Sequence, residues 1–544
     1  MDNSFVKAPV AVPRLSGFDK SHQNLLTSKV GTITPILVDE LIPGSRVNLK
    51  LALSASFPPL ASDTYMRCSI KTEAFFVPMR LLVGSFESWF TDDAKDTVDS
   101  VSTTGAVTTT SLKGYLPIIR DTSVGSESPT WLAPFMQAGS LPDYLGYRSV
   151  NPEFLRSNPV SAMPFLAYHK VFSDWYRNSL VQKECFLPDT GAAGLTGACV
   201  APYVFLNQNN YIWDSASSFA LADGKSIFDL RQRNFGLDYF TTATPDPQQG
   251  SAQVVTFDTS GSEGQFSIAA LRAANSMQQF KERNNLLGNL YVEQLYGRYG
   301  VRPSDGIAQR SLYLGRGEFE VYSKGIYQTN GAPADSSMAA NSQNPFDSVA
   351  SRYGSAYASG EHFLVNFEAT EPGYLFVMAT LVPRVTYSTG TDRMLTHYCK
   401  PGSLVEMANP ILQNMGPQPI YDYELSPARS ENIFGYTDRY AEFKTKQDSL
   451  HGLFRDGQSL QAFALQRSFD IGLEINSAFL EIPTNYMDQV TVTEAWLSEF
   501  GYMLDTYFEY HVAMPLSKYS LPTLQDPAYE HGKTIVVSRG GNKL

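Results

Sequence analysis

Alternating hydrophobic and polar positions predict several β-strands in this chain. Residues 46–57 place a hydrophobic side chain at every second position, and residues 65–76 repeat the pattern. A period of two is typical of a strand with one buried face. Pro58 and Pro59 separate the two runs, so the two strands can belong to different sheets.

Later segments repeat this strand pattern. Residues 374–382 are apolar on both faces, which predicts a central strand, and residues 505–514 alternate between apolar and polar positions. Residues 469–475 and 533–538 are shorter strand candidates. These strands follow one another without a regular helix between them, which predicts a mainly β fold, a sandwich or barrel of antiparallel strands.

Helical periodicity is rarer. Residues 267–298 carry apolar residues at helical spacing, with an interruption near Gly288, which predicts two helical pieces. Residues 164–181 are a second candidate and residues 81–90 a short third one. Long polar connections between these elements are typical of functional or interface-forming loops.

A proline divides the aromatic stretch at residues 73–90. Pro78 lacks an N–H group and cannot serve a central ladder, so we expect the strand to end there. The following residues then form a short amphipathic piece that covers a sheet edge or a neighbouring subunit. The alternative is a cluster within the chain. The candidate subunit-interface residues are Leu82, Phe86, Trp89 and Phe90.

The charge of the chain limits how it contacts nucleic acid. The 544 residues carry a net charge of −12, whereas a free-standing nucleic-acid binder is normally basic. Basic residues near the two ends can neutralise a polyanion, although a solvated terminal segment explains them equally well. These candidate nucleic-acid contacts are Lys7, Arg14, Lys20, Arg539 and Lys543.

The sequence contains no recognisable catalytic or metal-binding motif. The seven histidines form no H-E-x-x-H pattern, the four cysteines form no C-x-x-C pair, and there is no G-x-S-x-G or phosphate-binding loop motif. We therefore expect no enzymatic activity, no metal and no cofactor. No stretch approaches eighteen consecutive apolar residues, so we expect no membrane insertion, and we see no secretory signal.

Several collinear segments together resemble the major capsid proteins of Microviridae, particularly the gokushovirus branch. No single segment is specific for a chemical activity, but the order of the segments along most of the chain is specific for this family. The segments are FDKSH (18–22), TPILVDELIPGSRV (34–47), EAFFVPMRLL (73–82), MPFLAYHKVFSDWYRN (163–178), LRAANSMQQFKERNNLLGNLYVEQLYGRYGV (271–301), QRSLYLG (309–315), EPGYLFVMATLVPRVTY (371–387) and FGYTDRYAEFKTKQDSLHGLFR (434–455).

The resemblance implies an eight-stranded antiparallel jelly roll with large loop insertions and a few helices. We expect an N-terminal arm over 1–30 and one jelly-roll domain over 31–544. Within that domain the long inserted loops cover about 91–160, 183–265 and 328–361, and residues 530–544 form a C-terminal tail. Gokushovirus capsid proteins carry a long insertion before the segment that matches 271–301, but only a short stretch precedes it here. A surface protrusion is therefore reduced or moved to 328–361.

The resemblance also implies a structural protein of the virion. On this resemblance we expect copies of the chain to self-assemble into a small T=1 icosahedral shell around a circular single-stranded DNA genome. The expected partners are a small basic DNA-packaging protein and a host surface receptor, and the expected place of assembly is the bacterial host cytoplasm. The alternative function is an extracellular β-sandwich that binds or hydrolyses carbohydrate. The absence of a spaced carboxylate pair counts against that alternative.

Overall fold

The structure is a computed structural model. It describes residues 7–12, 15–61, 64–83, 86, 90, 97–101, 107–111, 116–119, 132–147, 152–186, 212–213, 221, 223–250, 268–288, 290–327, 352–396, 413, 415–427, 432–469, 473–491, 501–516 and 533–538.

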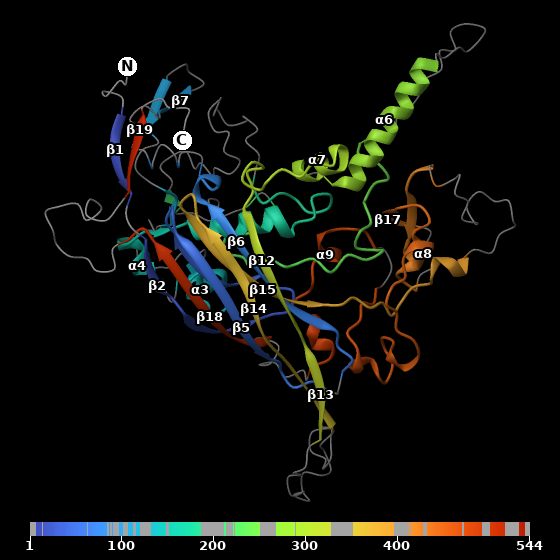
Figure 1. Cartoon of the computed structure of the whole chain (residues 1–544). Helices are drawn as coiled ribbons and strands as arrows, with labels where there is room; N and C mark the ends of the chain where they lie inside the picture. The colour runs from blue at the N-terminus through green and yellow to red at the C-terminus, as the bar shows by residue number, and fades with distance from the viewer. Residues whose placement is uncertain are drawn as a thin grey trace, which may run out of the picture.

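Two antiparallel sheets face each other and form the centre of the molecule (Figure 1). The larger sheet has the strand order β13 (Tyr322–Tyr327), β14 (Arg352–Glu368), β5 (Arg46–Ser56), β18 (Tyr502–Met514) and β2 (Ser16–Asp19), and β3 (His22–Ser28) pairs with the other end of β18. The smaller sheet has the order β12 (Leu312–Glu320), β6 (Cys68–Pro78), β15 (Gly373–Pro383) and β4 (Thr34–Leu41).

The pairing of the eight main strands is that of a jelly roll. Counted in chain order, β3, β4, β5, β6, β12, β14, β15 and β18 are the first to eighth strands. The first pairs with the eighth, the second with the seventh, the third with the sixth and the fourth with the fifth. Such a folded-back series of strand pairs, rolled into two sheets, gives the jelly-roll fold expected from the sequence.

The main hydrophobic core lies between the two sheets. β5 alternates buried and accessible residues along its whole length, as predicted. Ile70, Ala74 and Phe76 of β6 enter the same core from the smaller sheet. The two predicted strands therefore belong to different sheets. β15 is buried at every position between β6 and β4, so the prediction of a central strand is confirmed.

A second core covers the outer face of the smaller sheet. Phe75, Val77 and Phe376 point into it from β6 and β15. A layer of short helices closes it from the other side: α2 (Ala133–Met136), α3 (Leu141–Tyr144), α4 (Pro152–Ser157) and α5 (Met163–Val171). The smaller sheet is therefore buried on both faces, which explains why β15 is apolar throughout.

Buried polar contacts connect this helical layer to the sheet. Glu73 of β6 forms an ion pair with Arg233 at 2.6 Å and accepts a hydrogen bond from the Tyr176 hydroxyl at 2.5 Å. Burial by itself raises the pKa of Glu73, but the positive charge and hydrogen bonds of Arg233 hold this pKa below its ordinary value. The ion pair therefore fixes the layer at one position on the sheet.

His169 of α5 lies in a second buried contact. Its Nδ1 accepts a hydrogen bond from Arg231 Nε at 3.0 Å, and its Nε2 donates one to the Ile227 carbonyl at 2.8 Å. Arg231 in turn forms an ion pair with Asp223. Burial, together with the charge of Arg231, lowers the pKa of His169 well below its ordinary value, so this ring is neutral in the folded chain.

The structure shifts two boundaries that the sequence suggested. Residues 16–28 of the predicted N-terminal arm form β2 and β3, because their backbone pairs with β18 and completes the larger sheet. The jelly roll thus begins inside the segment 1–30. The second part of the predicted loop 328–361 belongs to β14, which starts at Arg352, and residues 328–351 lie outside the described part of the chain.

Two element predictions were incomplete. The helix predicted at 164–181 is α5 followed by a π-helical turn at Phe172–Tyr176, and the chain then leaves the helix at Arg177. Residues 469–475 form no strand in their described positions. The predicted pair of helices at 267–298 is confirmed as α6 (Ile268–Leu287) and α7 (Tyr291–Tyr299), and α6 extends away from the sheets (Figure 1).

Small elements complete the described chain. β1 (Lys7–Val12) pairs with β19 (Lys533–Ser538), β7 (Thr97–Val101) with β8 (Val107–Ser111), β16 (Gln418–Tyr421) with β17 (Ile433–Thr437), and β9 (Ile118–Ile119) with β10 (Val160–Ser161) and β11 (Ile212–Trp213). Two more short helices are α8 (Ala441–Lys444) and α9 (Ser477–Leu480). No helix in the described ranges is long and apolar enough to span a membrane.

Candidate functional site

Exposed hydrophobic side chains are concentrated on α6, α7 and the turn that follows. Ten of the 29 large hydrophobic residues that are exposed in the described chain fall between residues 268 and 307. Their exposed fractions lie between 45% and 77%. We call this set the α6–α7 surface: Ile268, Leu271, Met277, Phe280, Leu286, Tyr291, Tyr296, Tyr299, Val301 and Ile307. Such a concentration in a folded chain marks a surface for another macromolecule.

The C-terminal end of α6 attaches this surface to the body. The Asn285 amide donates to Thr244 Oγ1 at 3.1 Å, and Asn284 accepts a hydrogen bond from Arg298 of α7 at 2.8 Å. Both asparagines are buried, although asparagine is usually exposed. These contacts hold α6 in one direction while leaving its apolar side chains accessible.

Close packing between the two helices holds α7 beside α6. A Cβ at Gly297 would lie 2.0 Å from Leu287 Cδ2, so a larger residue there would force the Leu287 side chain to move. The Arg298 guanidinium lies 4.6 Å from the centre of the Phe280 ring, a cation–π contact. The two helices therefore form one ordered unit.

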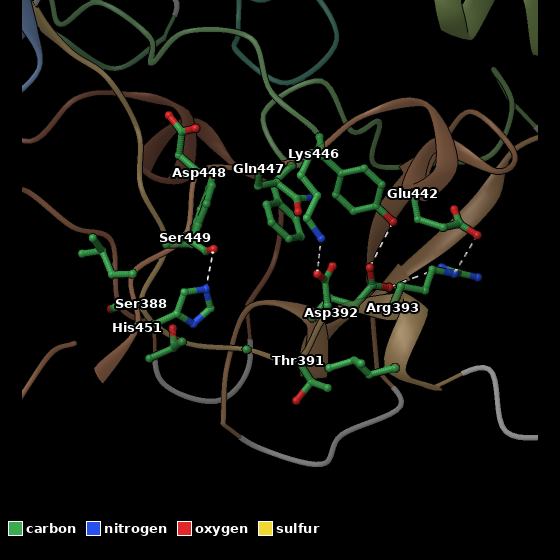
Figure 2. Close-up of a pocket in the computed structure, with 18 of the residues that line it drawn as sticks. Ser388, Thr391, Asp392, Arg393, Glu442, Lys446, Gln447, Asp448, Ser449 and His451 are labelled. Atoms are coloured by element: carbon green, nitrogen blue, oxygen red, sulfur yellow. Dashed lines mark hydrogen bonds and ion pairs between the residues drawn. The ribbon is translucent and has the colours of Figure 1, made fainter. Parts of the chain in front are cut away.

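A cluster of partly accessible charged residues lines a pocket of about 290 Å³ beside α8. Arg393 forms ion pairs with two carboxylates, Glu424 and Glu442, and Figure 2 shows Arg393 beside Glu442. The Arg393–Glu424 distance is 3.3 Å, and the Tyr239 hydroxyl donates to Glu424 at 3.0 Å. Burial raises the pKa of Glu424 in spite of the nearby Arg393. These contacts fix the floor of the pocket.

The rim of the pocket is also paired. Lys446 forms an ion pair with Asp392 at 2.8 Å, and Ser449 and His451 share a hydrogen bond of 3.1 Å (Figure 2). Among the described residues, no group of three or more His, Cys, Asp or Glu side chains has the geometry to hold a metal ion. The pocket is thus lined by ion pairs that connect the segment after β15 with α8, which is a structural arrangement.

The predicted interface residues separate into different environments. Leu82 and Phe86 are only 1% and 5% exposed and pack in the core beneath the helical layer. They therefore belong to the cluster within the chain, because their apolar area is already buried there. Phe90 is 62% exposed and stays a candidate for contact with another subunit. Trp89 lies outside the described residues.

The basic residues predicted to contact nucleic acid also lie in different environments. Lys20 forms an ion pair with Asp39 at 2.5 Å and lies 5.4 Å from the centre of the Tyr510 ring, so its charge is already paired within the chain. The backbone of Lys7 pairs with Ser538, which brings the two terminal segments together. Arg14, Arg539 and Lys543 lie outside the described residues.

The sequence already predicted the two helices at 268–299 but not their exposure. One signal was available: α6 carries apolar residues on more than one side, which is unusual for a surface helix of a self-contained protein. Helical periodicity reports the helix itself, whereas exposure depends on which other elements the tertiary structure places beside it.

Comparison with known proteins agrees with this architecture. The family model described as capsid protein (F protein) matches residues 7–263 and 253–524. Capsid protein VP1 of Chlamydia phage 1 is 24% identical over 96% of this chain and 98% of its own length. Capsid proteins VP1 of Bdellovibrio phage phiMH2K and Spiroplasma virus 4 are 23% and 22% identical and cover 96% and 93% of this chain, and 97% and 94% of their own lengths.

The first alignment extends over 627 positions, more than the 544 residues of this chain, so that relative has segments that this chain lacks. The residues before α6, where the sequence predicted a reduced insertion, lie outside the described part of the structure. The family match covers nearly the whole chain, and the strand order is that of a capsid jelly roll. The chain therefore belongs to the phage capsid protein (F protein) family, and it is a structural major capsid protein of a Microviridae-like phage.

Proposed function

We propose that copies of this chain assemble into a small icosahedral shell that encloses a circular single-stranded DNA genome. The observation that carries this proposal is the eight-stranded jelly roll within a chain that matches the capsid family from residue 7 to residue 524. The role is structural and needs no catalytic group. Assembly takes place in the cytoplasm of a bacterial host, and the finished virion binds a receptor on the host surface.

Electron microscopy and sedimentation of the purified chain test the shell. Closed particles of uniform diameter support the proposal. A monomer that binds a glycan and never assembles supports the alternative, an extracellular carbohydrate-binding or carbohydrate-hydrolysing sandwich. The paired carboxylates of the pocket in Figure 2 do not favour that alternative, because hydrolysis needs one carboxylic acid and one free carboxylate beside the sugar.

We also propose that the two terminal segments contact the genome. Lys7 lies on β1, which pairs with β19 directly before Arg539, so the basic residues of both ends can act together. Arg14 and Lys543 belong to the same segments. Basic side chains neutralise phosphates without regard to sequence, as packaging of a whole genome requires. Lys20 is left out of this group because it is paired with Asp39.

The acidic balance of the chain calls for a further partner. A net charge of −12 cannot neutralise a packed DNA strand. We infer that a separate, small and highly basic protein supplies the remaining positive charge. Purified particles are expected to contain such a polypeptide together with DNA. Particles that hold full-length DNA and only this chain would contradict the inference.

A further inference from the structure

We propose that the α6–α7 surface binds a second copy of this chain, on a patch that differs from the α6–α7 surface of that copy. The inference rests on the proposed shell and names one contact through which neighbouring subunits hold together. It follows from the size of the exposed apolar area, its position on the molecule and its charge.

The exposed area is large enough for a stable contact. A large side chain presents about 200 Å² when free. With exposed fractions of 45% to 77%, the ten side chains of the α6–α7 surface therefore present on the order of 1000 Å². A specific protein interface needs about 800 Å² from each partner. Because α6 carries these side chains on more than one side, a neighbour reaches the size of an ordinary interface when it packs around α6 and contacts α7 as well.

The position of α6 makes this area accessible to another subunit. The helix extends beyond the two sheets (Figure 1), and its buried residues Asn284 and Asn285 lie at the end nearest the body. At 100° per residue, Ile268, Arg272 and Leu286 lie within one arc of about 40° on the side away from those asparagines. A partner therefore meets both aliphatic and cationic groups.

The charge of the surface indicates which patch of the neighbour it meets. Residues 268–307 contain five cations and three anions, which gives this segment a net charge of +2. Since the whole chain has a net charge of −12, the remaining residues together carry −14. Two such surfaces facing each other would bring like charges together. Docking on another part of the neighbouring chain brings opposite charges together. The contact is therefore heterologous, with two different patches meeting.

A second copy fits this surface better than nucleic acid does. Arg272 and Arg283 could both contact phosphates, but the exposed aliphatic residues Ile268 and Leu286 offer nothing to a phosphate backbone. A protein surface with apolar and acidic groups can contact both the aliphatic side chains and the arginines.

The first test removes apolar area without disturbing the folded chain. The double variant Ile268→Ser with Leu286→Ser changes side chains that are 67% and 57% exposed. We expect an unchanged melting temperature for the unassembled chain and at least a tenfold rise in the protein concentration needed for particles. The matched control is Leu237→Ser with Leu395→Ser, at residues 86% and 76% exposed outside this surface, and it should assemble like the wild type.

The second test changes charge. Arg272→Gln with Arg283→Gln should raise the concentration needed for assembly and make it less dependent on salt. Stronger assembly of this variant would overturn the heterologous contact in favour of α6 pairing with its own copy. Shells that form at the wild-type protein concentration but contain less nucleic acid would overturn the proposal in favour of a nucleic-acid surface. Nuclease treatment before assembly removes nucleic acid, so an effect that remains after it is an effect on the contact between subunits.

The outcomes for the contact and for the shell are distinguishable. If the wild type forms particles and both variant pairs form them equally well, the α6–α7 contact is overturned and the shell stands. If the Ser variant lowers the melting temperature by more than the control does, Tyr299→Ser with Val301→Ser repeats the test at residues 72% and 60% exposed. If the wild type never assembles, both proposals fail.

Discussion

Phe75 and Phe76 are neighbours in β6 but lie in two different hydrophobic cores. Phe76 packs between the two sheets, 4.9 Å from the ring of Phe367 of β14, whereas Phe75 packs under the helical layer, 6.0 Å from Trp175. Successive side chains of a strand point to opposite faces, so one strand serves both cores. The aromatic run that precedes Pro78 is thus explained by burial on two sides.

Replacing either phenylalanine with alanine should destabilise the unassembled chain by about 3–5 kcal/mol, since each leaves a cavity in a packed core. Despite being adjacent, the two changes should add to within about 0.5 kcal/mol, because their side chains share no partners. Denaturant unfolding measures this. Phe75→Ala combined with Trp175→Ala is the control and should deviate from additivity. Strong coupling between positions 75 and 76 would contradict the separation of the two cores.

Breaking the Glu73–Arg233 pair should be costly. Glu73→Leu leaves the Arg233 charge in a site where its side chain is only 18% exposed, and the expected loss is about 3–5 kcal/mol of unfolding free energy. Removing both charges with Glu73→Leu and Arg233→Met should lose less than the single change. A double variant that is less stable than Glu73→Leu would show that the pair itself, rather than the unpaired charge, dominates. Glu318→Gln, at a side chain 41% exposed, is the surface control.

Stability should fall in mild acid because of His169. Its pKa in the folded chain is lowered well below the ordinary 6.5 by burial and by Arg231, so the unfolded chain binds the proton more readily. Its stabilising contribution is therefore complete above pH 6.5 and is lost as the pH falls below that value, at up to about 1.4 kcal/mol per pH unit.

Thermal unfolding from pH 7.5 to 5 measures this dependence. His169→Gln keeps a donor for the Ile227 carbonyl and an acceptor for Arg231, and it should flatten the profile over this range. His511→Gln, at a histidine whose side chain is 53% exposed, is the matched control. An unchanged pH profile in the His169 variant would show that another group causes the acid sensitivity.

The terminal basic residues and Lys20 should have separate effects. Replacing Lys7, Arg14, Arg539 and Lys543 with alanine should leave shells intact and reduce the DNA that they hold, most clearly at low salt. Lys20→Ala should leave the DNA content unchanged and lower stability by at most about 1 kcal/mol, because it breaks a partly exposed pair with Asp39. The ratio of absorbance at 260 and 280 nm of purified particles reports the DNA. Equal DNA loss in both variants would contradict this division of roles.

The sequence by itself determined the strands β5, β6, β15 and β18, the two helices at 268–299 and the mainly β fold class. Alternation in residues 46–56 and continuous apolarity in 374–382 reflect burial on one face and on two faces, which is a local property of each strand. The order of the resembling segments indicated the capsid family before any contact was known. These properties depend on residues that are close together in the sequence, so the hydrophobic pattern of each segment and the order of the segments are enough to predict them.

Only the tertiary structure decided which surfaces remain open. It placed Leu82 and Phe86 in an intrachain core and left apolar side chains of α6 and α7 exposed. It also recruited residues 16–28 into the larger sheet and paired Lys20 with Asp39. Exposure and pairing depend on residues far apart in the chain, and a periodic pattern within one segment contains no information about its distant neighbours.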